Sequence, residues 1–210
     1  MTGSGGASSV EVELTFDVDE LTTLPDWTGL PGVAHVAGPE HRDLDARYLD
    51  LADVALGRAG YAVRRRSGGP DEGWHIKGPR RSDGGRLETH WPLDDIDGAV
   101  VPDAVAAAVA AIAPGPLLAL ARIRNARDAY ALTDADGGLI AEFVDDHVQA
   151  TDERRGATSS WREWEFELGP AAPTDPAARA ELLAAATDAV LRAGGRVAAS
   201  DSKLARTLGL

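Results

Sequence analysis

Residues 161–168 read WREWEFEL and contain the clearest strand signal in the sequence. Acidic and large apolar side chains alternate there, and an extended chain carries the two types on opposite faces. The acidic face holds Glu163, Glu165 and Glu167. Same-face side chains lie about 7 Å apart, where two carboxylates repel by about 2 kcal/mol at an effective dielectric constant of about 20. Three such side chains on one strand therefore favour a cation nearby.

The same alternation recurs along the chain and predicts an antiparallel β protein with a few helices, the α+β class. We expect strands at residues 10–16, 43–49, 61–66, 74–77, 86–93, 118–132, 139–149 and 161–168. We expect helices at residues 52–59, 102–113, 176–193 and 202–208, from their capping residues and terminal glycines. The proline- and glycine-rich residues 24–39 are expected to form a loop.

The composition predicts one folded domain over residues 10–210. The 210 residues are 44% hydrophobic and 26% charged and contain no cysteine, which excludes a disulfide framework. Residues 1–9 are glycine- and serine-rich and predict a flexible leader without the features of a signal peptide. Since no apolar run reaches the roughly eighteen residues of a membrane helix, we expect a cytoplasmic protein with no membrane partner.

The charge balance restricts the kind of ligand. A net charge of −13 argues against nucleic-acid binding, which depends on a basic surface, so an anionic ligand needs a local, shielded basic site. Of the 21 basic residues only Lys77 and Lys203 are lysine. This bias either reflects composition alone or marks two places where a compact ammonium is wanted instead of a planar guanidinium.

Charged side chains share one face on several of the expected strands. The same-face groups are Glu11 with Glu13, Arg64 with Arg66, His75 with Lys77, Arg86 with Glu88 and His90, Arg122 with Arg124, and Glu142 with Asp146. One interpretation is that these faces meet solvent while the apolar faces form the core of a sandwich. The other is a barrel with a charged interior and an apolar outer face covered by helices. In such a barrel, carboxylates would hold Mg²⁺ or Mn²⁺ and basic walls would hold phosphate oxygens.

Five short motifs resemble those of CYTH-domain proteins, the triphosphate tunnel metalloenzyme superfamily. They are Glu11-Val12-Glu13, Tyr48-Leu49-Asp50, the pair AVRRR at 62–66 and GWHIK at 73–77, WEFE at 164–167, and Ser202-Lys203-Leu204. The motifs occur in family order from about residue 10 to residue 208, nearly the whole chain, and include both lysines. The resemblance implies a closed eight-stranded antiparallel β-barrel with flanking helices, whose tunnel handles a triphosphate.

The resemblance also implies roles for individual residues. Metal-binding roles are implied for Glu11, Glu13, Glu165 and Glu167, with Glu163 and Asp146 as further candidates. Phosphate-binding roles are implied for Arg64, Arg66, Lys77, Arg124 and Lys203. The candidate catalytic groups are Glu11, Glu13 and Lys77. A bulge near residues 122–127 would instead turn Arg127 inward.

One residue departs from the family pattern, because Thr15 stands where the ExExK signature has its lysine. A hydroxyl cannot supply that positive charge to a phosphate. The resemblance therefore implies either metal-dependent hydrolysis of tripolyphosphate or an organic triphosphate, or binding of polyphosphate or a nucleotide without turnover. The acidic strands favour the first function and Thr15 favours the second.

The chain looks most similar to CYTH domains fused to a CHAD domain, a helical polyphosphate-associated module. A CHAD domain is therefore an expected partner, and the chain is either a stand-alone member or an excised domain. The sequence leaves the oligomeric state open.

Overall fold

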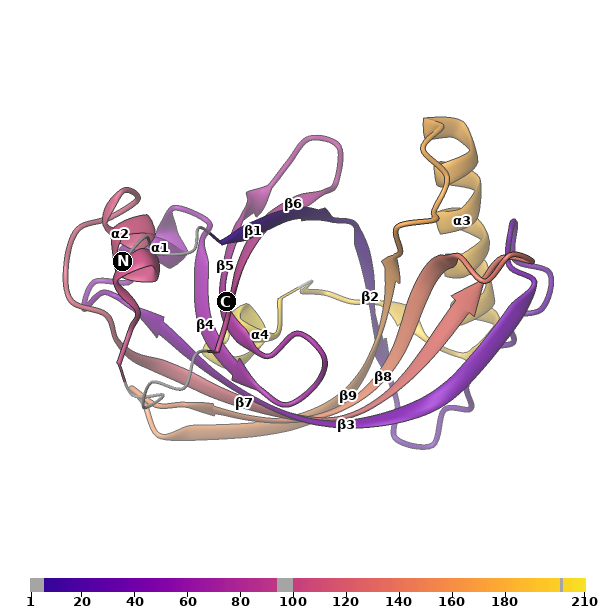
Figure 1. Ribbon diagram of the computed structural model, residues 1–210. Coiled ribbons are helices and arrows are strands. Elements are labelled where there is room, and N and C mark those ends of the chain that lie inside the picture. The colour runs from indigo at the N-terminus through magenta and orange to yellow at the C-terminus, as the bar shows by residue number, and fades with distance from the viewer. Residues whose placement is uncertain (1–5, 94–99, 201) are drawn as a thin grey trace.

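The computed structural model describes residues 6–93, 100–200 and 202–210, and the described residues form one antiparallel sheet of ten strands with four helices. The strands are β1 (Ala7–Glu11), β2 (Glu13–Val18), β3 (His35–Asp50), β4 (Ala62–Ser67), β5 (Gly73–Arg80), β6 (Arg86–Pro92), β7 (Leu118–Thr133), β8 (Leu139–Asp152), β9 (Ala157–Leu168) and β10 (Arg196–Val197). The helices are α1 (Ala55–Arg58), α2 (Asp103–Ala110), α3 (Pro176–Ala193) and α4 (Lys203–Leu208). The sheet curls into a half-barrel (Figure 1).

The sheet is not the closed eight-stranded barrel that the resemblance implies. Its order is β1-β6-β5-β4-β3-β7-β8-β9-β2-β10, and no ladder among the described residues joins β1 to β2. These two strands are nevertheless consecutive in the chain, with only Val12 between them. Because the segment changes its pairing partner at Val12, from β6 to β9, it connects the two sides of the open sheet by a covalent link.

The expected elements are present, but the expected strand at residues 10–16 is divided at Val12 into β1 and β2, and β10 was not expected. The other differences lie at the ends of the elements. β3 begins at His35, inside the expected loop, and β1 begins at Ala7, inside the expected leader. Residues 1–5 of that leader lie outside the described residues. α1 begins only at Ala55, where the Asp50 carboxylate accepts hydrogen bonds from the first-turn backbone N–H groups of Leu56 and Gly57.

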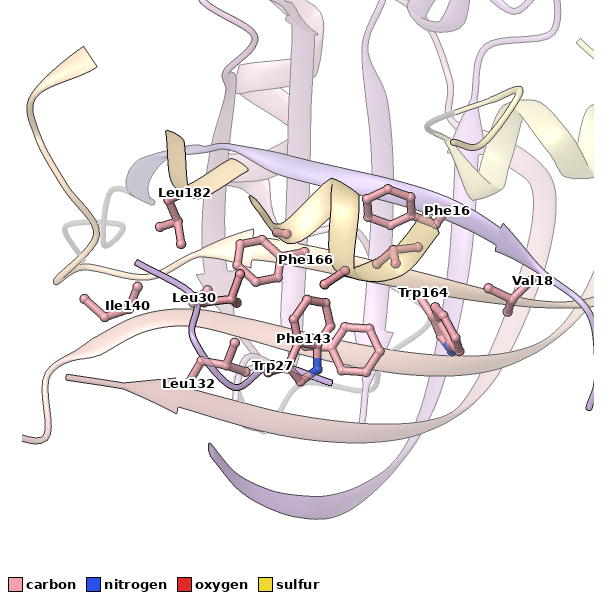
Figure 2. Close-up of a cluster of buried hydrophobic side chains, with 14 residues drawn as sticks. Phe16, Val18, Trp27, Leu30, Leu132, Ile140, Phe143, Trp164, Phe166 and Leu182 are labelled. Carbon is pink, nitrogen blue, oxygen red and sulfur yellow. The ribbon is translucent and has the colours of Figure 1, made fainter. Parts of the chain in front are cut away.

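The outer face of one half of the sheet packs against α3. Phe16, Phe143, Trp164 and Phe166 point to this side and are at most 1% exposed. Figure 2 shows this cluster, which Trp27 completes with its ring centroid 4.7 Å from that of Phe143. Burying each side chain of this size stabilises the fold by about 2–3 kcal/mol through the hydrophobic effect. This free energy fixes which face of each strand points toward α3.

The other half of the outer face packs against α1 and α2. Leu56, Val105 and Val109 from the helices cover Val63 of β4 and Trp74 of β5, and all five are buried. The expectation that helices cover an apolar outer face is therefore confirmed. The alternating charged side chains of the same strands consequently point to the inner face. None of the described helices combines the length and the apolar character that crossing a bilayer requires.

α4 lies on the inner side of the sheet, against β7 and β8. Leu204 packs there against a small apolar cluster that includes Tyr48 and Ile123. The helix starts at Ser202, whose hydroxyl accepts a hydrogen bond from the backbone N–H of Ala205 at 3.2 Å. This cap fixes the direction in which the next residue, Lys203, enters the half-barrel.

Candidate functional site

The inner face of the sheet bounds a cavity of about 360 Å³, large enough for a small ligand. Among the described residues, seven basic and six acidic side chains line it. The basic ones are Arg42, Arg64, Arg66, Lys77, Arg86, Arg127 and Lys203, and the acidic ones are Glu11, Glu13, Asp71, Glu142, Glu165 and Glu167. In a chain with a net charge of −13, basic and acidic groups are therefore nearly equal in number on the cavity wall.

One wall of the cavity is acidic. Glu11 and Glu13 come from the two sides of the break at Val12, and Glu13 lies opposite Glu167 in the ladder between β2 and β9. Burial raises the pKa of Glu13. Burial, and after it the neighbouring Glu11 carboxylate, raises the pKa of Glu167 to about 8. These carboxylates are thus crowded and short of compensating positive charge.

Lys77 joins the acidic wall to the basic one. Its ammonium lies 2.7 Å from Glu11, 3.8 Å from Glu13 and 3.6 Å from Glu88. Burial alone would lower the pKa of this lysine, but the charges of Glu13 and Glu11 raise it. Lys77 therefore stays charged at the point where the two walls meet.

The basic wall is built from adjacent strands. Arg64 and Arg66 project inward from β4, where burial, and then the charges of Arg64 and Arg127, lower the pKa of Arg66. Arg66 forms an ion pair with Asp71, and Arg64 lies 3.8 Å from Glu88. Like charges held this close in a buried site favour an anion between them.

A second acidic cluster lies beside α4. One carboxylate oxygen each from Asp146, Glu163 and Glu165 lie within 4.8 Å of one another. The Lys203 ammonium lies 3.0, 2.5 and 2.6 Å from these three groups. Arg127 also contacts Asp146 and Glu165, at 2.6 and 2.9 Å. Two cations already compensate this cluster, in contrast to the wall formed by Glu13 and Glu167.

The structure brings most of the sequence-predicted residues together. Those that line the cavity are Glu11, Glu13, Arg64, Arg66, Lys77, Glu165, Glu167 and Lys203. Asp146 and Glu163 are buried behind the wall and contact Lys203. The structure does not bring Arg124 to this cavity, because it is exposed and its side chain lies 3.7 Å from Asp45 on the other face of the sheet.

Arg127 takes the inward position on β7, and no bulge is needed for that. The ladder between β7 and β8 is unbroken from Ala121 to Leu132. Ile123, Asn125 and Arg127 therefore share the inner face. The pair formed by Arg122 and Arg124 does share a face, as expected, but that face is the outer one.

Sequence reasoning gave no site role to four charged cavity residues, namely Arg42, Asp71, Arg86 and Glu142, although it placed Arg86 and Glu142 on charged strand faces. Arg42 contacts Glu142 through two hydrogen bonds of 3.0 Å. The sequence pattern did not mark Arg42 as a cavity residue, because the other inward residues of β3 are Leu44, Ala46 and Tyr48, which form a mostly apolar face. Asp71 lies in the hairpin turn between β4 and β5, where alternation cannot predict which way a side chain points.

Thr15 lies opposite Glu165 in the ladder between β2 and β9 and is 8% exposed. Its hydroxyl oxygen has no hydrogen-bond partner within the described part of the chain. The position that resembles a signature lysine is thus buried next to the acidic strand and carries no charge.

Comparisons with known proteins support the fold. No protein-family model matches the chain. Two proteins of Mycobacterium tuberculosis, MT2285 of strain CDC 1551 / Oshkosh and Rv2226 of strain H37Rv, both named only as uncharacterized, are 36% identical to it over 213 residues. The match covers 97% of this chain and 41% of each relative, so the chain spans about two fifths of the curated relatives it matches.

Solved structures share the architecture. A proposed adenylate cyclase from Bacillus halodurans superposes with a TM-score of 0.64 at 16% identity, over 95% of this chain and 97% of that one. The PH1819 protein from Pyrococcus horikoshii superposes with a TM-score of 0.58 at 14% identity, over 95% of this chain and 98% of that one. HpAC1 from Hippeastrum, a proposed adenylyl cyclase reported to have a dominant triphosphatase activity, superposes with 0.54 at 17% identity, over 95% of each chain. At such identities these matches show the fold alone.

Proposed function

We propose that the chain is a single CYTH-like tunnel domain whose cavity binds a triphosphate-like polyanion and, with a divalent metal, hydrolyses a phosphoanhydride bond. The observation that carries the proposal is the meeting of seven basic side chains with an acidic wall in one cavity. The reported triphosphatase activity of HpAC1, a protein of the same fold, supports it.

The basic side chains suit a linear polyphosphate. Arg64, Arg66 and Arg127 offer planar guanidinium groups that bind phosphate oxygens through paired hydrogen bonds. Lys77 offers a compact ammonium between the walls. Because catalysis of phosphoryl transfer consists mainly of positioning and charge stabilisation, these residues would orient the ligand and stabilise the charge of the leaving group.

The acidic wall fits a hard divalent cation such as Mg²⁺ or Mn²⁺, which prefers carboxylate oxygens. Glu11, Glu13, Glu165 and Glu167 would hold it, and the raised pKa of Glu167 indicates a lack of positive charge there. When bound, such a metal neutralises phosphate oxygens and lowers the pKa of water. Asp146 and Glu163 are less suited, because they are buried behind the cavity wall, whereas Glu165 lines the cavity.

The second candidate function is binding of polyphosphate or a nucleotide without turnover. Thr15 favours it, since a buried hydroxyl without a partner stands where the resemblance expects an ammonium. Both functions share the basic wall, and they differ in whether the bound anion is cleaved.

The test is phosphate release from tripolyphosphate with Mg²⁺ and with Mn²⁺. Arg64 and Arg65 are neighbours on β4, but only Arg64 lines the cavity, so they form a matched pair. We expect Arg64→Gln to lower the rate by about a hundredfold and Arg65→Gln to change it by less than about twofold. Tight binding without release would favour the second function, and equal effects of the two substitutions would contradict the assignment of the basic wall.

A further inference from the structure

His75 and Glu88 form a buried pair directly behind the basic wall. They lie on neighbouring strands, β5 and β6, and are 1% and 4% exposed. His75 Nδ1 lies 2.6 Å from Glu88 Oε1, and His75 Nε2 lies 3.0 Å from the backbone carbonyl oxygen of Asp71. Neither residue lines the cavity itself.

The second oxygen of Glu88 faces two cavity cations. Glu88 Oε2 lies 3.6 Å from the Lys77 ammonium and 3.8 Å from the Arg64 guanidinium, and it has no hydrogen-bond partner among the described residues. These distances exceed those of a direct charged hydrogen bond, which is about 2.7–2.9 Å. Glu88 thus attracts both cations without binding either of them tightly.

With its proton on Nδ1, His75 donates a hydrogen bond to Glu88 Oε1, and this bond explains why Glu88 stays at that distance. A carboxylate fixed through Oε1 cannot rotate toward Lys77 and Arg64, whereas a free one would form close ion pairs with them. Such ion pairs would compete with phosphate oxygens for the same cations.

We propose that His75 is a positioning residue, which holds Glu88 so that Lys77 and Arg64 remain oriented toward the cavity and available to an anionic ligand. This inference rests on the proposed function of the cavity. His75 touches no ligand and acts through Glu88.

The two ring nitrogens allow a sharp test. In His75→Asn the side-chain amide can occupy the place of Nδ1 and keep the hydrogen bond to Glu88. In His75→Gln the amide reaches the place of Nε2 and keeps the contact with Asp71 instead. We expect the dissociation constant for sodium tripolyphosphate, measured by calorimetry in metal-free buffer, to stay within about threefold in His75→Asn and to rise about tenfold in His75→Gln.

A second variant separates positioning from a merely structural role. Adding Glu88→Gln to His75→Gln removes the competing charge, so the affinity should return to within about threefold of wild type. The inference would be overturned if the two single variants lost equal affinity for tripolyphosphate, or if His75→Asn lost more than His75→Gln. A double variant that still binds tripolyphosphate weakly would also overturn it. If His75→Gln does not fold, a loss of affinity in a folded His75→Asn overturns it by itself. A wild-type protein that does not bind tripolyphosphate overturns the proposed function, and this inference with it.

Discussion

Glu167 is a carboxylate that the fold holds in an unfavourable place. Its pKa is raised to about 8 by burial and by Glu11, against an ordinary value of 4.5. Because the folded protein binds this proton more tightly than the unfolded chain, the contribution to stability is complete below pH 4.5 and is lost as the pH rises through about 8.

Glu167→Gln should remove that loss. Between about pH 5 and about pH 9 we expect the metal-free wild type to lose on the order of 4 kcal/mol more unfolding free energy than the variant. Urea denaturation at both pH values measures the difference. Glu153→Gln, at an exposed position, is the control and should keep the wild-type pH dependence. The same pH dependence in wild type and Glu167→Gln would contradict the burial of this carboxylate.

Thr15 decides between the two candidate functions. Thr15→Lys would place an ammonium beside Glu165, near both the acidic wall and the bound anion. One well-placed electrostatic contact is worth about 3 kcal/mol in a transition state, so we expect kcat for tripolyphosphate to rise at least several-fold if the site is catalytic. In a binding module the dissociation constant should fall without turnover. If a folded variant shows neither effect, residue 15 lies outside the site.

At the scale of elements, ion pairs of Lys203 join α4 to the sheet, beside the apolar contact of Leu204. Lys203 is 10% exposed and compensates three carboxylates, so Lys203→Gln should destabilise the fold by about 3 kcal/mol. Arg155→Gln is the control, since Arg155 also contacts α4, through the carbonyl oxygen of Leu208, but is 69% exposed and should cost less than about 1 kcal/mol. Thermal and urea unfolding measure the stability of both variants. Similar losses of stability in Lys203→Gln and Arg155→Gln would contradict the role of the Lys203 ion pairs in anchoring α4.

The strands also show what alternation can and cannot predict. It grouped the residues of β9 by face correctly, because that strand carries acidic residues on one side and large apolar residues on the other, and on β4 it placed Arg64 and Arg66 together. On β7 the resemblance implied a phosphate-binding role for Arg124, although Arg127 is the inward residue. Alternation places these two arginines on opposite faces but, with small alanines around them, does not show which face is the inner one. The change of pairing partner at Val12 was not predictable, since it depends on how β6 and β9 lie relative to each other and not on local sequence.

At the scale of the whole molecule, the sequence left two arrangements open. A charged strand face can meet solvent or line a cavity, and alternation is the same in both. What decides between them is long-range, namely the packing of α3, α1 and α2 against the apolar faces. The motif resemblance favoured the correct arrangement but implied a closed barrel, whereas the described sheet is open, with β1 and β10 as its two edge strands.

The central claim is that the cavity binds a triphosphate-like anion, and the most direct measurement is the stability of the protein with tripolyphosphate. A ligand that binds only the folded state at about a hundred times its dissociation constant raises the unfolding free energy by about 3 kcal/mol. We predict a rise of this size for wild type and for Arg65→Gln, and a much smaller one for Arg64→Gln at the same ligand concentration. An unfolding curve that saturating tripolyphosphate leaves unmoved, with and without Mg²⁺, would contradict the account.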